Sequence, residues 1–297
     1  MIPYELKVLE APLVGTFPLM VGKLGYLSVS MQKFLGFNNA SMCYKAPNDP
    51  TLKKNTPCLL RLGIEQSKNQ SFLSAIASIY NSVKDLKNDD NTYVKLKINK
   101  PELTIKELKE TIIKNLTLDK FVSANKGNLI SHFGTNDSIR FTNEMKESKI
   151  YQGINNKKSI YLKKIGNGYK NFIEYLKDDE IEINYEFLWD LICEPITGTG
   201  ILFETGINLI IFNSPKDDIT DKIEVICPKN DYSENFFNKS LPTIFLYKEY
   251  FQYEPIIQVE MRDNIEYNLK KYFEFKKIKD YENISEIVEI LEYIQNQ

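Results

Sequence analysis

The feature that most constrains this chain is an apolar stripe at helical spacing between residues 69 and 83. The stripe consists of Phe72, Ala75, Ile76, Ile79, Tyr80 and Val83, which fall at i, i+3, i+4, i+7, i+8 and i+11. This spacing predicts a helix that begins near Ser67 or Asn69 and ends by Asp85. Because alanine and serine occupy the neighbouring positions, we expect a central helix that is buried over much of its circumference.

The N-terminal end of this helix is where we expect chemistry, if the chain has any. The first turn of a helix has free backbone N–H groups and the positive end of the helix dipole, and both favour an anion. Cysteine proteases place their nucleophile at such an end. Here the residue in the first turn is Ser71.

The composition is that of a soluble globular protein. Of the 297 residues, 42% are hydrophobic and 26% are charged, and the net charge is −2. A chain of this length can bury a substantial core. Its small net charge gives no whole-molecule attraction to nucleic acid or to an anionic membrane.

Several classes of protein are not expected from this sequence: zinc proteins, secreted proteins and membrane-spanning proteins. The cysteines form no CxxC pair, which makes a poor zinc set, so we expect reduced thiols, no metal and no cofactor. No basic-then-apolar leader opens the chain, and its longest apolar run, residues 207–212, is too short to span a bilayer. These features predict a soluble, non-secreted protein without a membrane partner. The cysteines and the histidine are Cys43, Cys58, Cys193, Cys227 and His132.

Caps and spacing predict further helices. Thr104 and Glu107 form a capping box that opens a helix through Leu116. Asp119 is expected to cap a shorter helix through Val122, stopped before Gly127. The other predicted helices occupy residues 29–35, 169–176, 185–193 and 285–294.

The second half of the chain has a strand period. Unbroken β-branched and aromatic runs predict strands at residues 207–212, 223–227, 243–247 and 252–257, after an earlier strand at 58–64. The short spacings between the later strands favour an antiparallel meander. Helices early and strands late predict an α+β protein, with the central helix packed on a mainly antiparallel sheet.

The order of these pieces resembles the OTU-type cysteine proteases, the ovarian-tumour-domain deubiquitinases. Residues 68–76, Lys-Asn-Gln-Ser-Phe-Leu-Ser-Ala-Ile, line up with the Asp-Gly-Asn-Cys-Leu/Phe segment of that family. The later strands and Gln252–Ile256 line up with its closing strands, which include a His-Tyr pair. The resemblance implies an OTU-like, papain-type domain over residues 57–260. An extended arm, 1–56, would precede it, and a helical extension, 261–297, would follow it.

This chain departs from the family where the chemistry would be. Ser71 stands in the place of the nucleophilic cysteine, Lys68 replaces the preceding acid, and Gln252 replaces the histidine before Tyr253. Acyl transfer needs a nucleophile and a base within hydrogen-bond reach, and glutamine cannot be that base. The departures imply a non-catalytic copy of the fold. The alternative is an OTU-like hydrolase of the deubiquitinase type with Ser71 as nucleophile and His132 as base.

A second resemblance is to the large subunit of the viral early transcription factor of nucleocytoplasmic large DNA viruses. It is carried by residues 25–35, by Cys58–Arg61 and by Tyr253–Ile256, Tyr-Glu-Pro-Ile. It implies a scaffold or interaction domain within a longer polypeptide, with other viral transcription components, the polymerase machinery and promoter DNA as partners. The location it implies is the host cytoplasm, in a viral factory, or the virion. A structural virion protein is an alternative that the sequence leaves open.

Two lysine clusters are candidate nucleic-acid contacts. The first is Lys157, Lys158, Lys163 and Lys164, close to Tyr161 and Tyr169; lysines placed like this can follow a phosphate backbone without reading sequence. The composition favours the other interpretation, a solvated helix face in a lysine-rich protein. The same two interpretations apply to the second cluster, Lys270, Lys271, Lys276, Lys277 and Lys279.

One acidic set has the look of a nuclease metal site. Asp217 and Asp218 follow one predicted strand and Glu224 lies on the next. A restriction-type nuclease also needs an acid-x-Lys on the second strand, and Glu224-Val225-Ile226 has no lysine. We therefore expect a solvated loop and no metal.

Overall fold

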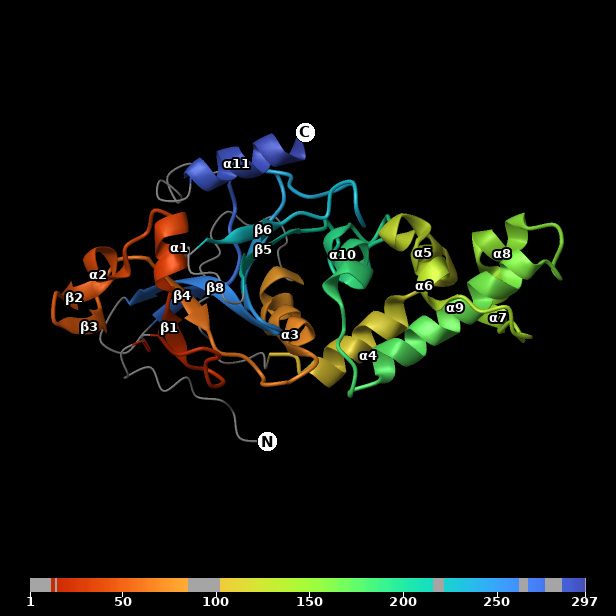
Figure 1. Cartoon of the computed structure of the whole chain (residues 1–297), viewed down its shortest axis with the longest axis horizontal. Coiled ribbons are helices and arrows are strands. Elements are labelled where there is room, and N and C mark those ends of the chain that lie inside the picture. Colours follow the sequence, from red (N-terminus) through yellow and green to blue (C-terminus); the bar gives the residue numbers. More distant parts are fainter. Residues whose placement is uncertain are drawn as a thin grey trace. The chain divides into compact units, whose positions relative to one another are not determined.

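The computed structural model describes residues 12–13, 15–84, 102–215, 222–261, 267–275 and 285–296 (Figure 1). The chain divides into two compact units. The first comprises residues 1–105, 208–227 and 237–297, and the second comprises residues 106–207 and 228–236. The units do not follow the boundaries at 56 and 260 expected from sequence, because the helices after residue 105 form a body of their own.

A seven-stranded sheet is the frame of the first unit (Figure 1). Its strand order is β1-β4-β8-β7-β5-β6, and β9 also pairs with β8. Every pairing is antiparallel except that between β5 and β7. The predicted α+β class with a mainly antiparallel sheet is thus confirmed. The strands are β1 Leu24–Tyr26, β4 Cys58–Leu62, β5 Asn208–Ser214, β6 Glu224–Ile226, β7 Thr243–Glu249, β8 Gln252–Met261 and β9 Tyr267–Lys270.

The predicted meander is wrong at one position. β5 pairs in parallel with β7, from Asn208 opposite Thr243 to Ser214 opposite Glu249, and β6 lies on the far side of β5. Parallel neighbours require a crossover connection. Here the connection is the segment 228–236, which leaves the sheet after β6 and belongs to the second unit.

The central helix is α3, Ser71–Lys84, and every residue from Ser71 to Tyr80 is buried. The prediction of a helix buried around its circumference is confirmed, with its start a few residues later than expected. α3 packs on β8, where the ring of Phe72 lies 5.5 Å from that of Tyr253. The first residue of the helix, Ser71, therefore lies at the start of β8.

The segment expected to be an extended arm contains regular structure. β1 is an edge strand on β4, and the N–H of Gly63 donates to the Lys23 carbonyl at 2.8 Å. A Cβ on Gly63 would lie 2.0 Å from the Met20 carbonyl oxygen, so glycine permits this close approach. The remaining elements of this segment are α1 Val29–Phe34, which was predicted, α2 Asn39–Met42, β2 Tyr44–Ala46 and β3 Asp49–Leu52.

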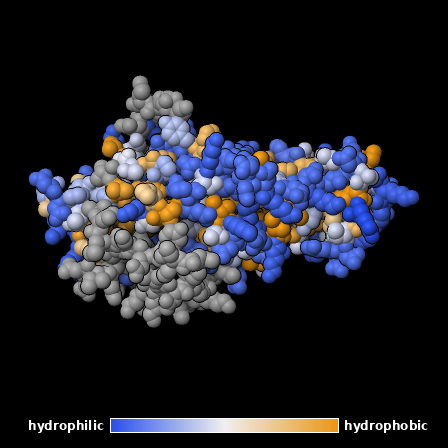
Figure 2. Space-filling view, turned by 90° about the horizontal axis from the view of Figure 1, so that it is seen from below, coloured by the Kyte–Doolittle hydropathy of each residue, from blue (hydrophilic) through white to orange (hydrophobic). Residues whose placement is uncertain are grey.

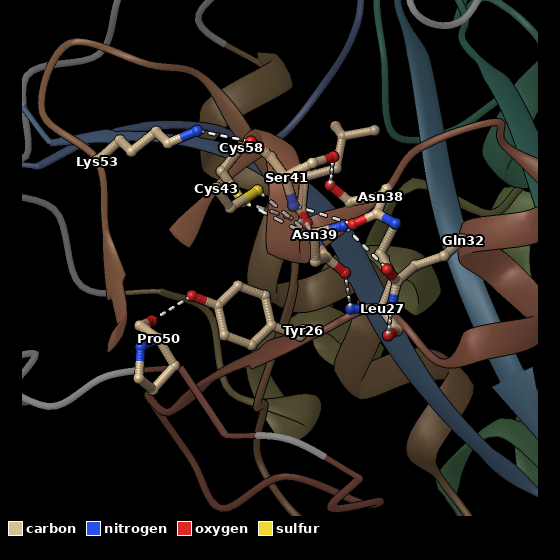
Figure 3. The surroundings of a disulfide bond; sticks show 11 residues. Tyr26, Leu27, Gln32, Asn38, Asn39, Ser41, Cys43, Pro50, Lys53 and Cys58 are labelled. Carbon is tan, nitrogen blue, oxygen red and sulfur yellow. Dashed lines mark hydrogen bonds between the residues drawn. A yellow bond between two sulfur atoms is a disulfide. The ribbon is translucent and has the colours of Figure 1, made fainter. Parts of the chain in front are cut away.

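A disulfide joins Cys43 to Cys58 and corrects the expectation of reduced cysteines (Figure 3). Cys58 is the first residue of β4, and Cys43 follows α2. The amide nitrogen of Asn39 lies against both sulfurs and donates to the Leu59 carbonyl, while its oxygen accepts from the Leu27 N–H at 3.1 Å. The disulfide and Asn39 thus fix the α1–β3 segment to the sheet. Cys193 and Cys227 are not part of a disulfide.

The second unit is helical. Its core includes Phe121 and Phe172, which are fully buried with ring centroids 5.6 Å apart. The N-cap of α5 is Thr117, whereas Asp119, the predicted cap, accepts the N–H groups of Lys149 and Ile150 at the start of α8. The helices are α4 Ile105–Asn115, α5 Leu118–Ser123, the 3₁₀ turn η1 Ala124–Gly127, α6 Leu129–Phe133, α7 Asn143–Glu147, α8 Lys149–Gly153, α9 Ile160–Lys177 and α10 Tyr185–Cys193.

Segment 228–236 completes the core of the second unit. The ring of Tyr232 packs edge-on against Trp189 of α10, 5.6 Å between centroids, and against Tyr185. Asp190, the residue after Trp189, is buried and accepts the Asn125 N–H at 2.9 Å. No helix in the described ranges has the length and apolar character needed to cross a membrane. The remaining helix, α11 Ser285–Gln295, belongs to the first unit and was predicted.

Candidate functional site

The N-terminus of α3 is the candidate site, and Ser71 is its first helical residue. The loop before α3 forms hydrogen bonds with the first turn of the helix. The Gln70 N–H donates to Ser67 Oγ at 3.0 Å, and the Ser74 N–H donates to the Gln70 carbonyl at 3.0 Å. The Ser74 hydroxyl donates to the Glu65 carbonyl at 2.7 Å, which holds the loop against the first turn. Ser71 is therefore placed by a loop that is fixed at both ends.

The Ser71 hydroxyl is buried and accepts a hydrogen bond. The side chain is 3% exposed, and its oxygen accepts the backbone N–H of Tyr253 at 2.9 Å. A nucleophile has to reach a substrate and give up a proton to a base. Ser71 instead bridges the start of α3 to the start of β8, which is a structural use of its oxygen.

Gln252 directly precedes Tyr253, whose N–H donates to Ser71 Oγ. It is the first residue of β8, opposite Glu249 in the β7–β8 hairpin, and its amide nitrogen donates to the Ser67 carbonyl at 3.1 Å. Gln252 and Ser71 are thus both held at the N-terminal end of α3. The pair lacks an imidazole, and its amide is engaged with the loop that leads into α3.

Behind these residues, an ion pair buried in the sheet was not predicted from the sequence. Arg61 of β4 and Glu254 of β8 are 2.6 Å apart, with side chains 3% and 1% exposed. Arg61 also donates to the carbonyls of Tyr26 and Thr16, and Glu254 accepts the Leu19 N–H. Burial raises the pKa of Glu254, and the guanidinium opposes that shift.

The sequence did contain a signal for this pair. Arg61 is the single charged residue in the apolar strand Cys58–Leu62, and a charge in a strand buried on both faces requires a partner. The guanidinium also lies 5.7 Å from the ring centroids of Phe17 and Tyr247. The pair joins the N-terminal segment to the strand that begins at Gln252.

His132, the proposed base of the alternative hydrolase, lies in α6 of the second unit. Its side chain is exposed, and its ring packs 5.0 Å from that of Phe187. Ser71 belongs to the first unit. The contact with Phe187 gives His132 a packing role within the second unit.

The first lysine cluster lies at the start of α9. Lys157 and Lys158 are exposed, while Lys163 and Lys164 are half-buried. Lys157 donates to the carbonyls of Tyr151 and Gln152, and its ammonium lies 4.5 Å from the centre of the Tyr151 ring. These contacts are made by the ammonium group of Lys157 itself, and the residue remains exposed.

The second lysine cluster falls largely outside the described residues, which exclude Lys276, Lys277 and Lys279. Lys271 donates to the Ser78 carbonyl at 2.8 Å and pairs with Glu102, and Lys270 lies over the Tyr272 ring. Lys271 therefore has a structural role at α3.

The acidic set is tested only in part. Asp217 and Asp218 lie outside the described residues, while Glu224 is exposed on β6 and accepts from the Asn213 amide at 2.9 Å. Within the ranges that the structure describes, no group of three or more His, Cys, Asp or Glu side chains could hold a metal ion.

Comparisons with known proteins give one relative from a giant virus. The chain is 25% identical over 223 residues to a protein of Acanthamoeba polyphaga mimivirus whose name says only that it is uncharacterized. The match covers 70% of this chain and 12% of the relative, so the chain spans a small part of that protein's length. No protein-family profile matches the chain. No solved structure matches it significantly. The expected similarity to viral proteins is supported.

Proposed function

We propose that the first unit is a non-catalytic, OTU-like module that serves as a scaffold or interaction domain in a viral transcription-factor-like protein. The observation that supports this most directly is the hydrogen bond from the Tyr253 N–H to the buried Ser71 hydroxyl. It occurs where an OTU protease would place its nucleophile, and it gives that position a purely structural role. The resemblance of residues 68–76 and 252–256 to the family supplies the rest of the proposal.

The missing base supports the same proposal. A serine hydroxyl is much harder to deprotonate than a thiol, so a serine nucleophile depends on an adjacent base. Gln252 occupies the place of that base, and an amide cannot accept the proton at neutral pH. The loss of both groups removes the nucleophile and the residue that would activate it.

Proposed partners are other segments of a longer polypeptide, other viral transcription components and promoter DNA, in a viral factory or in the virion. The low share of the mimivirus relative that the chain covers is consistent with a segment of a larger assembly. Lys157, Lys158, Lys163 and Lys164 would supply sequence-independent phosphate contacts to DNA.

The experiment that tests the proposal compares the purified chain with its Ser71→Ala variant in two assays. One is hydrolysis of a fluorogenic ubiquitin substrate, and the other is labelling by a fluorophosphonate that modifies activated serines. We expect neither protein to hydrolyse ubiquitin or to be labelled. Hydrolysis by the wild-type protein that disappears in a folded Ser71→Ala variant would establish the hydrolase alternative.

A restored pair tests the OTU-like geometry itself. In the Ser71→Cys/Gln252→His variant, an imidazolium beside the helix N-terminus should lower the pKa of the introduced thiol by roughly one unit or more relative to Ser71→Cys alone. The measurement is the pH dependence of alkylation by iodoacetamide. Equal thiol pKa values in the two variants would mean that residue 252 does not reach the nucleophile position.

A further inference from the structure

The second unit contains a strongly basic segment that is wider than the four lysines noted above. Residues 135–171 include eight basic side chains and three acidic ones, Asp137, Glu144 and Glu147, a net charge of +5 in a chain whose total is −2. Six of the eight basic residues are exposed and two are half-buried. The eight are Arg140, Lys146, Lys149, Lys157, Lys158, Lys163, Lys164 and Lys170. We call their surface the basic face.

The segments that form the basic face pack on one another. The ring of Phe141 lies 5.1 Å from that of Tyr151 in α8, and Lys157, which precedes α9, contacts the same tyrosine. A Cβ on Gly166 of α9 would touch Phe141 and Ile139, so the strip before α7 lies directly on α9. The positive charges therefore lie on segments that pack together, so the folded state keeps these like charges close to one another.

The charges of the basic face are not neutralised within the described part of the chain. None of the eight side chains forms an ion pair there. Several other lysines do pair with carboxylates: Lys45, Lys109, Lys126, Lys177, Lys239 and Lys271. Concentrated like charge destabilises the compact state through self-repulsion and attracts polyanions. A polyanion that binds here would relieve that repulsion.

One aromatic side chain close to these lysines in the sequence is exposed to solvent. Tyr161, in the first turn of α9, is 58% exposed, and its neighbour Ile160 is 68% exposed. On the helix, Tyr161 and Lys164 are three residues apart and share a face. Figure 2 shows that the surface around α7 and α8, on the right in both views, is mainly hydrophilic with isolated hydrophobic residues.

We infer that the basic face binds single-stranded nucleic acid, with the lysines on the phosphates and Tyr161 stacked on a base. Exposed aromatic rings beside lysines are how sequence-tolerant single-strand binding is built, because every base has a face to stack on. The bases of a duplex are already stacked on each other, so they offer no such partner to Tyr161. The inference rests on the proposed function only in taking nucleic acid as a partner, and it does not depend on the OTU-like relationship.

The test is fluorescence anisotropy of the whole chain with a labelled single-stranded oligonucleotide and with a duplex of the same sequence, over a range of NaCl concentrations. Wild-type protein should prefer the single strand, with affinity that falls steeply as salt rises. The variant Lys146→Gln/Lys149→Gln/Lys158→Gln should bind roughly 10- to 100-fold more weakly at 0.1 M salt, and its salt slope should be smaller by about 2. In the part of the chain that the structure describes, none of these three side chains forms a hydrogen bond or an ion pair.

The matched control removes the same charge elsewhere. Lys54→Gln/Lys106→Gln/Lys114→Gln changes three exposed lysines outside the basic face and should bind as the wild type does. Equal weakening in both triple variants would overturn the assignment to the basic face. So would failure of the wild-type protein to bind the single strand at 50 mM NaCl.

Tyr161 distinguishes single strands from duplexes. Tyr161→Ala should weaken single-strand binding roughly tenfold, the loss of one stacked base, while Tyr161→Phe keeps the ring and the affinity. Tighter binding to the duplex, together with no effect of Tyr161→Ala, would overturn this inference and would support the promoter contact of the proposed function. Hydrolase activity is read independently, so the two proposals can fail separately.

Discussion

At the scale of single residues, the Arg61–Glu254 pair has the largest consequence for stability. Replacement of Glu254 by glutamine leaves Arg61 as a buried charge without a counter-charge. Removal of one partner of a buried ion pair typically costs about 3–5 kcal/mol. We expect Glu254→Gln to lower the free energy of unfolding of the first unit by that amount, measured by urea denaturation followed by far-UV circular dichroism.

The control for this prediction is Glu289→Gln, which makes the same chemical change at an exposed position on α11. It should change stability by less than about 0.5 kcal/mol. Similar losses in the two variants would show that the Glu254 carboxylate is not holding the guanidinium.

Asp190 gives a pH dependence with a defined sign. Burial raises the pKa of this carboxyl, and its hydrogen bonds to Ser233 and Asn125 only partly oppose the shift. When the folded-state pKa is above the unfolded value, stability is fully present below the unfolded pKa, about 4, and is lost as pH rises through the folded pKa. The second unit should therefore lose stability above about pH 4 through this group.

Asp190→Asn tests that dependence because the amide keeps an acceptor for the Asn125 N–H and has no charge to bury. As pH rises, the free energy of unfolding of the variant should increase relative to that of the wild type. The stability of the variant should also vary less with pH. The measurement is urea denaturation from acid to neutral pH, and the exposed Asp137→Asn is the control. If stability falls with rising pH as steeply in Asp190→Asn as in the wild type, Asp190 is not the source of the pH dependence.

At the scale of elements, the sequence predicted those helices whose residue spacing is sufficient by itself to identify them. The stripe from Phe72 to Val83 predicts α3 because its spacing alone marks a buried helix. The same holds for α1, α10 and α11. The contacts of residues 252 and 253 with the start of α3 join residues far apart in the chain, and no local pattern reveals them.

The features that the sequence did not predict are contacts between distant segments and elements of only a few residues. The parallel β5–β7 pairing depends on segment 228–236 leaving the sheet, which local spacing does not reveal. β1 has three residues, too few for a period. The Arg61–Glu254 pair requires knowledge that β4 neighbours β8. The Cys43–Cys58 bond depends on the fold of the α1–β3 segment, which the separation of 15 residues does not reveal by itself.

The disulfide is the element-scale prediction. It closes a loop of 15 residues, and a loop of that size should contribute about 3 kcal/mol by restricting the unfolded chain. We expect Cys43→Ser/Cys58→Ser to lower stability by about that much. Reductant should then leave the variant unaffected while it lowers the denaturation midpoint of the wild type. Identical midpoints for both proteins under oxidising conditions would contradict a stabilising bond.

At the scale of the whole molecule, the division into two units should be visible in unfolding. The only tryptophan, Trp189, lies in the second unit, whereas far-UV circular dichroism reports both. Separate cores unfold separately unless a large interface couples them. We expect Glu254→Gln to shift the circular dichroism curve and leave the Trp189 fluorescence transition in place. A common shift of both curves would show one cooperative body.

The sheet order also has a consequence for biosynthesis. The carboxylate of Glu254 is translated 193 residues after Arg61, its partner. At about 5–20 residues per second, that interval lasts roughly 10 to 40 s. Throughout it, β4 and α3 have left the ribosome before the strand that covers them exists, while the helices after residue 105 already have most of their partners. The nascent chain should therefore require a chaperone at residues 58–84, and release should follow the emergence of β8.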